Sequence, residues 1–278
     1  MRKDNGRICR EFCRRHPVIT GRPDLATADV SIRQQLRVWF ASNLGASLLQ
    51  VEKVKANQAL ADLFGYHIVQ LGCLHDGGFI EASRISHKII LQLDERVNHD
   101  CRTDVISAAD SLALASESMD VVFMPHVLEY TANPHKLLRE VERILIGDGH
   151  VVLIGFNPWS LWGLWRLLQA WREVPPWCGH FFGLARIKDW LSLLDLECIS
   201  VENFFFRPPL RNSRLMQRLG FLEKLGKYCW PWFGSAYIIV ARKRVLPLTP
   251  IKMRWRDKRH IIAGIAEPST RMRDTLHE

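Results

Sequence analysis

The stretch SMDVVFMPHVLEYTANPHKLLREVERILIGDGHVVLIGFNP, residues 118–158, decides the fold class of this chain. Residues 119–124 form an apolar run of strand length, and residues 151–154 form a second one. Between them, residues 134–145 place leucine, valine and isoleucine on one helical face, with Pro134 in the first turn. This order of strand, helix and strand predicts a parallel pair of strands joined by a crossover helix.

The flanking sequence extends this alternation in both directions. We expect short helices over residues 79–86 and 186–194. Several of the remaining apolar runs are apolar on both faces, as strands of a sheet with two covered faces are. The sequence therefore predicts an α/β fold with a mostly parallel sheet and helices on both faces. The further strand-like runs are residues 67–71, 88–93, 104–107, 197–206 and 235–240.

Composition and periodicity divide the chain into segments. In the first helical segment apolar residues recur at i+4 from Leu36 to Leu48, and Gly45 argues against one continuous helix. The predicted segments are a poorly ordered leader (1–30), a helical segment (31–65), the α/β domain (66–244) with a tryptophan-rich lid or interfacial insertion (158–185), and a basic tail (245–278).

The net charge of +9 is unevenly distributed. Residues 1–60 carry 11 basic and 5 acidic groups, residues 61–155 carry 7 and 14, and residues 156–278 carry 20 and 10. A uniformly basic nucleic-acid binder would lack such an acidic centre. The distribution fits an acidic domain for a small cationic cofactor with basic flanks for an anionic partner, or simply solvated surfaces.

The cysteines and the lengths of the apolar runs indicate in which cellular compartment the protein is expected. The 7 cysteines include no CxxC pair, and Cys9 and Cys13 lack a second Cys or His pair at a suitable spacing. We therefore expect no metal site and reduced thiols. No run reaches the roughly 18 apolar residues of a spanning helix, and no apolar stretch follows the charged start. We expect a cytoplasmic protein, with contact to the inner membrane face as a hypothesis.

From residue 66 to residue 244 the order of motifs resembles the class I S-adenosylmethionine-dependent methyltransferases, in particular a bacterial subgroup with the type 11 methyltransferase domain. The resemblance implies a Rossmann-like seven-stranded sheet with a reversed last strand, S-adenosylmethionine as cofactor, and methyl transfer to an acceptor that the motifs do not identify. The motifs are SMDVV (118–122), HVLEY (126–130), NP (133–134), LRE (138–140), RIL (143–145), GDG (147–149) and GFNPWSLWG (155–163).

The resemblance assigns cofactor contacts to the loop after the first strand. The family has an acidic residue, a hydrophobic residue and GxGxG there, whereas this chain reads QLGCLHDGG over residues 70–78. Gly72 matches the first glycine, Cys73 follows it, and Leu74 stands where the second glycine belongs. Gln70 replaces the acid and can hydrogen-bond the amino-acid end of the cofactor without pairing with its ammonium. A non-catalytic binding module with the methyltransferase fold therefore stays open beside the enzyme.

Two later loops are expected to complete the cofactor site. Asp94 lies 22 residues after Gly72, the spacing of an acidic residue that accepts ribose hydroxyls, although an ordinary strand-end aspartate is the alternative. The resemblance places Asp110 at the adenine amino group, with Ser111 as a further contact. The alternative for Asp110 is a turn-capping role.

His126 follows the fourth strand, beside the expected cofactor. Near neutral pH it could remove a proton from the acceptor, or it could be a structural residue that fixes the loop. Glu129 is a second candidate for proton removal, with a cap or ion-pair partner as its alternative. We therefore assign His126 to both the cofactor-binding and the catalytic candidates.

The tryptophan-rich segment favours either a lid helix or an interfacial helix. At 100° per residue, Trp159 and Trp162 fall opposite the apolar face. The basic cluster at residues 252–259 would add attraction to anionic lipid or RNA, but no aromatic stacking pattern favours RNA. We expect a small-molecule or lipid-like acceptor, with peripheral membrane contact as a hypothesis. The residues expected to share the apolar face are Leu161, Leu164, Trp165, Leu168 and Trp171.

Overall fold

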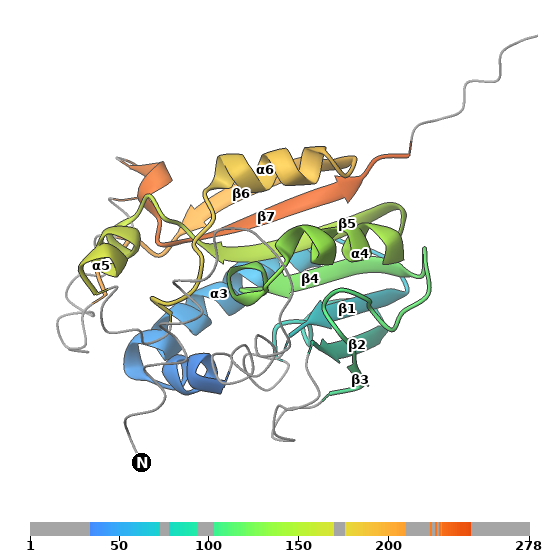
Figure 1. Ribbon diagram of the computed structural model, residues 1–278, viewed down its shortest axis with the longest axis horizontal. Coiled ribbons are helices and arrows are strands. Elements are labelled where there is room, and N and C mark those ends of the chain that lie inside the picture. The colour runs from blue at the N-terminus through green and yellow to red at the C-terminus, as the bar shows by residue number, and fades with distance from the viewer. Residues whose placement is uncertain are drawn as a thin grey trace, which may run out of the picture. The chain divides into compact units, whose positions relative to one another are not determined.

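A seven-stranded sheet forms the centre of the molecule (Figure 1). Its strand order is β3-β2-β1-β4-β5-β7-β6, in which β1 to β5 pair in parallel and β7 runs antiparallel to both β5 and β6. This confirms the predicted α/β fold with a reversed last strand. The computed structural model describes residues 34–72, 78–93, 103–169, 176–209, 223, 226, 228 and 230–245.

The elements follow the predicted alternation closely. The strands are β1 His67–Leu71, β2 His87–Gln92, β3 Val105–Ile106, β4 Met119–Pro125, β5 Leu145–Phe156, β6 Leu196–Phe204 and β7 Ala236–Lys243. The helices are α3 Asn43–Ala61, α4 Pro134–Ile144, α5 Leu161–Gln169 and α6 Leu184–Ser192, with short 3-10 helices η1 Leu128–Tyr130 and η2 Pro231–Phe233. Within the described part of the chain, each helix is too short or too polar to cross a lipid bilayer.

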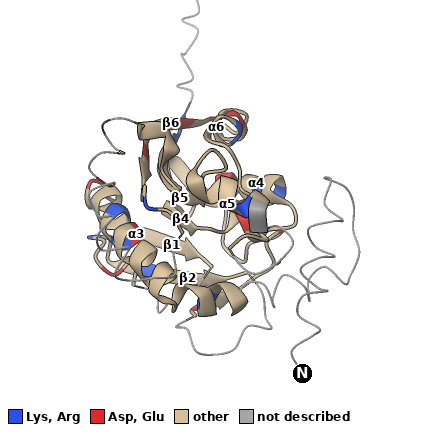
Figure 2. Cartoon of the chain, turned by 90° about the vertical axis from the view of Figure 1, so that its left-hand side faces the viewer, with Lys and Arg blue, Asp and Glu red and all other residues tan. Residues whose placement is uncertain are grey.

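Two separate apolar layers cover the sheet, because its central strands are buried on both faces. Figure 2 views the sheet end-on, with α3 on one side and α4 and α6 on the other. On the α3 side, Leu48 and Leu60 pack with Phe123 of β4. On the opposite side, Leu138 of α4 and Ile187 of α6 pack against the other face of the same strands.

The helical segment at the amino side divides at residues 41–42 instead of at Gly45. Residues 34–40 are helical, and α3 starts after Ser42, whose side chain accepts a hydrogen bond from the Gly45 amide at 3.3 Å. A Cβ on Gly45 would lie 2.3 Å from the carbonyl oxygen of Trp39. The glycine therefore allows the two helices to approach each other, and it does not interrupt α3.

The prediction of a short helix over residues 79–86 is wrong. The segment consists of turns, in which the Ser83 amide bonds to the Ile80 carbonyl at 3.1 Å and the Ser83 hydroxyl accepts from the Ile85 amide at 3.3 Å. Serine hydroxyls compete with helical hydrogen bonds in this way. The buried side chains of Ile80 and Ile85 then anchor the turns to the α3-side core. The predicted leader and, apart from Val245, the basic tail lie outside the described residues.

The packing face predicted for the tryptophan-rich helix is wrong for Leu161, Trp162 and Leu164, whereas Trp159 is exposed as expected. The Leu168 side chain and Trp171 lie outside the described residues. Trp162, expected opposite the apolar face, is 0% exposed, whereas Leu161 and Leu164 are 47% and 57% exposed. The Trp162 ring lies 5.8 Å from that of Trp39, and its Nε1 donates to the Arg207 carbonyl at 2.9 Å. Periodicity fails here because α5 has only nine residues, so its orientation is set by this aromatic cluster and not by the average apolar face.

We expect Trp162→Ala to lower the free energy of unfolding by about 3–5 kcal/mol, because it empties a closed aromatic site. Trp159→Ala should cost less than about 1 kcal/mol, since that side chain is 78% exposed. Urea unfolding of the two variants measures the difference. Equal losses would contradict the burial of Trp162.

Candidate functional site

The loops after β1 and β4 meet at the carboxyl edge of the sheet. The order β2-β1-β4 puts the reversal of strand order beside β1, which is where open α/β sheets bind ligands. Gly72 has a φ of +77°, a left-handed conformation that glycine adopts without strain. A Cβ at this position would lie 3.4 Å from Cγ2 of Val127, so the two loops are in contact.

Gln70 lies at the end of β1 with its side chain fully buried. Its Nε2 donates to the Gly72 carbonyl at 3.0 Å and supports the turn. Its Oε1 is buried and has no hydrogen-bond partner within the described part of the chain. Buried acceptors are rarely left unpaired, so this oxygen fits a donor group of a bound ligand.

His126 lies directly after β4 between two carboxylates. Its Nε2 is 2.8 Å from Oε1 of Glu52 in α3, and its Nδ1 is 3.2 Å from Oε1 of Glu129 in η1. All three side chains are buried. The His126 backbone has a φ of +50°, and its ring lies 4.1 Å from the ring of Phe156. We call these three residues the buried Glu-His-Glu group.

The two carboxylates determine the charge of His126. Burial alone would lower its pKa, but Glu52 and then Glu129 outweigh this effect and raise the pKa to about 10. At neutral pH the ring is therefore a cation whose two N–H groups donate to the carboxylates. Such a ring has no lone pair to accept a proton. The geometry favours the loop-fixing role of His126 over the proton-accepting one.

The buried group joins three parts of the fold. Oε1 of Glu129 also accepts from the Phe156 amide at the end of β5, at 2.7 Å. The His126 amide donates to the Ile154 carbonyl at 2.9 Å. Thus α3, the β4 loop and β5 are held together at the edge where the β1 loop arrives. Oε2 of Glu52 and Oε2 of Glu129 have no hydrogen-bond partner among the described residues.

Residues 107–118, the loop after β3, carry Asp110 and Ser111. Asp110 is half-exposed and pairs with Lys136 of α4 at 3.1 Å. The Ser111 side chain is exposed, and its carbonyl accepts from the Ser107 hydroxyl at 2.6 Å. The structure thus keeps both predicted residues accessible at this edge.

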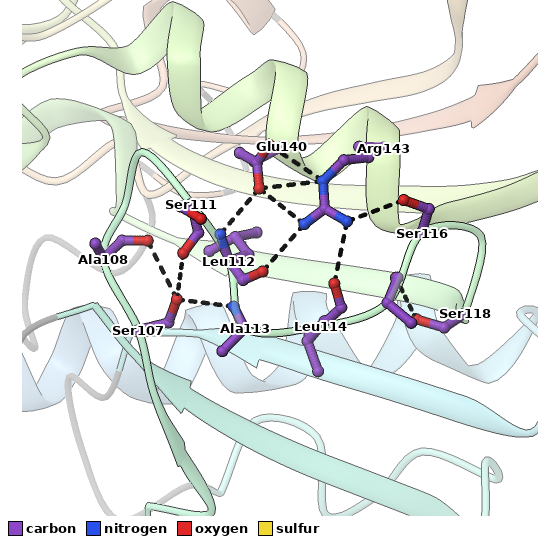
Figure 3. A network of polar contacts seen from close by, with 11 residues as sticks. Ser107, Ala108, Ser111, Leu112, Ala113, Leu114, Ser116, Ser118, Glu140 and Arg143 are labelled. Carbon is purple, nitrogen blue, oxygen red and sulfur yellow. Dashed lines mark hydrogen bonds and ion pairs between the residues drawn. The ribbon is translucent and has the colours of Figure 1, made fainter.

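Glu140 and Arg143 of α4 fasten this loop (Figure 3). Glu140 accepts from the Leu112 amide at 2.9 Å, and Arg143 donates to the carbonyls of Leu112 and Leu114 at 3.0 and 3.1 Å. The hydrogen bond to Arg143 lowers the pKa of Glu140. The loop is therefore held in one shape by charge-assisted bonds before any ligand arrives.

The structure brings together Gln70, Gly72 and the His126 loop, whereas Cys73 and Asp94 lie outside the described residues. Sequence reasoning missed Glu52, although a signal was present. Glu52 occupies the buried face of α3, four residues after Leu48 and four before Ala56. An acidic residue on an apolar stripe indicates a buried partner. Among the described residues, no side-chain group has the arrangement of a metal site.

We expect the imidazole of His126 to titrate near pH 10 by NMR. Because this pKa lies above the ordinary 6.5, the resulting stabilisation is complete below about pH 6.5 and is lost as pH rises toward 10. One proton contributes a slope of at most about 1.4 kcal/mol per pH unit. Glu52→Gln, which removes one carboxylate charge, should lower the pKa of His126. Titration near 6.5 in the unmodified protein would contradict this electrostatic picture.

The sequence of this chain is similar to a known domain family and to a known protein. A family model described as a methyltransferase domain matches residues 73–153. The uncharacterized protein YafS of Escherichia coli (strain K12) is 34% identical over 195 residues, which cover 69% of this chain and 75% of YafS.

Solved structures of low sequence identity share the fold. A methyltransferase of Thermotoga maritima described as SAM-dependent superimposes with a TM-score of 0.60 at 19% identity, covering 79% of this chain and all of that one. A SAM-dependent methyltransferase of Archaeoglobus fulgidus gives a TM-score of 0.50 at 17% identity, covering 70% and 94%. At these identities the likeness concerns the fold alone.

Proposed function

Because the chain belongs to the class I S-adenosylmethionine-dependent methyltransferases, we propose that it transfers a methyl group from S-adenosylmethionine to an acceptor at the carboxyl edge of its sheet. The observation that supports this proposal most directly is the meeting of the β1 and β4 loops at the reversal of strand order. There Gly72 has the left-handed backbone and Gln70 presents an unpaired buried oxygen.

The hydrogen-bonding groups and the backbone conformation at this edge are suited to binding S-adenosylmethionine. Oε1 of Gln70 is an acceptor suited to the cofactor ammonium, and the Gly72 turn permits close approach of the backbone. The fastened loop that carries Asp110 and Ser111 would receive the adenine. Cys73 and Asp94 remain candidates for the glycine-loop and ribose contacts.

The cofactor supplies a methyl group bound to a positively charged sulfur. The chain's own contribution is chiefly to position the reactants. In this proposal His126 is a positioning residue, because both of its nitrogens are engaged by Glu52 and Glu129. The contacts with Glu52 and Glu129 keep the loop that carries His126 in one position beside the proposed cofactor site.

A non-catalytic binding module is the second candidate, and the neutral Gln70 favours it. An amide hydrogen-bonds an ammonium but lacks the full charge of the acidic residue expected at this position. A module of this kind would bind the cofactor or its demethylated product without transferring the methyl group.

Incubation of the protein with labelled S-adenosylmethionine and fractions of cell extract separates the two candidates. Methyl transfer that is present in the unmodified protein and reduced in Asp110→Ala supports the enzyme.

Calorimetry with S-adenosylmethionine and S-adenosylhomocysteine tests the proposed cofactor site. Gln70→Leu should weaken binding by about tenfold, the loss expected when one buried hydrogen-bond acceptor is removed. Gln58→Leu is the matched control, because it makes the same change on the exposed surface of α3. Failure of the unmodified protein to bind either compound at millimolar concentration would contradict the proposal. Equal weakening in both variants would contradict the role of Gln70.

A further inference from the structure

Six large apolar side chains are exposed on the turn before α5, on α5 itself, and in or next to η2. Single exposed apolar residues are ordinary on a protein surface, but exposed tryptophans that gather on one patch indicate a binding surface. Three of the six are tryptophans with exposures of 60% or more. We define the aromatic edge as Trp159, Leu161, Leu164, Trp230, Trp232 and Phe233.

A buried asparagine holds the aromatic edge together. Oδ1 of Asn157 accepts from the Trp159 amide at 3.0 Å, and its Nδ2 donates to the carbonyls of Trp232 and Gly234 at 2.8 and 3.0 Å. The turn before α5 and the 3-10 helix η2 are thereby fixed side by side. Figure 1 shows α5 at the end of the sheet where β5 finishes and β7 begins. The exposed rings are thus presented from fixed backbone positions.

The chain segment that contains half of the aromatic edge is basic in sequence. Residues 205–235, which connect β6 to β7 and contain Trp230, Trp232 and Phe233, have six basic residues and one acidic residue. The acidic one, Glu223, pairs with Arg207 at 2.9 Å. A partner that matches the exposed rings needs an apolar layer, and the net positive charge of residues 205–235 favours a partner that is also anionic.

We propose that the aromatic edge docks on the surface of an anionic lipid bilayer. Tryptophan rings favour the boundary between headgroups and acyl chains, and each nearby basic residue adds about 1 kcal/mol of attraction to an anionic leaflet. A second copy of the chain fits less well, because a symmetric contact would bring two basic segments together. The proposal does not depend on methyl transfer.

Sedimentation with lipid vesicles tests the docking without any activity assay. The protein should bind vesicles containing about one third phosphatidylglycerol at least about tenfold more tightly than vesicles of phosphatidylcholine alone, and high salt should weaken this binding. The double variant Trp159→Ala and Trp232→Ala should lose about tenfold or more in affinity for the anionic vesicles.

Phe64→Ala with Tyr66→Ala is the matched control. These exposed rings precede β1, at the opposite edge of the sheet, and their loss should leave vesicle binding unchanged. Lys224→Gln with Lys227→Gln should weaken binding to anionic vesicles only, which keeps the test decisive if the tryptophan variant fails to fold. Equal binding to both kinds of vesicle, or binding to neither, would overturn the proposal. If the protein forms a dimer in solution and the tryptophan variant does not, the aromatic edge binds a second copy of the chain instead of a bilayer.

Discussion

The contact of His126 with Glu52 and Glu129 is the interaction on which the site depends. It connects α3, the β4 loop and the end of β5, and it holds His126 in a left-handed backbone conformation. Burying three charged groups is costly unless they pair with good geometry. The group therefore contributes less to net stability than to a single arrangement of the loop. That loop faces Gly72, where the cofactor is proposed to bind.

The sheet could be predicted from the sequence because its determinants are local. The runs in residues 118–158 have strand and helix periods, and the helix between them has an apolar face that needs no tertiary information. The contact between Glu52 and His126 could not be predicted in the same way, since it joins residues 74 positions apart. The lone acid on the buried face of α3 indicates a buried partner but does not identify it.

Predictions from local periodicity failed for two short segments, because specific contacts determine the conformation or orientation of each. Trp162 entered the core because α5 is short and its ring fills a site lined by Trp39 and Phe156. Residues 79–86 formed turns because the Ser83 hydroxyl bonds the backbone locally. Trp159 is exposed, as the periodicity predicts, so an exposed aromatic surface lies beside the buried Trp162. The proposed cofactor site and the aromatic edge both belong to the edge where the parallel strands end.

The most direct test of the proposed site is a crystal structure of the full chain with S-adenosylhomocysteine. We expect the ligand beside the β1 and β4 loops, with its amino-acid end at Gln70 and its adenine near Asp110. His126 should remain between Glu52 and Glu129, as its cationic state requires. A ligand bound away from these two loops, or a His126 ring turned away from both carboxylates, would contradict the account.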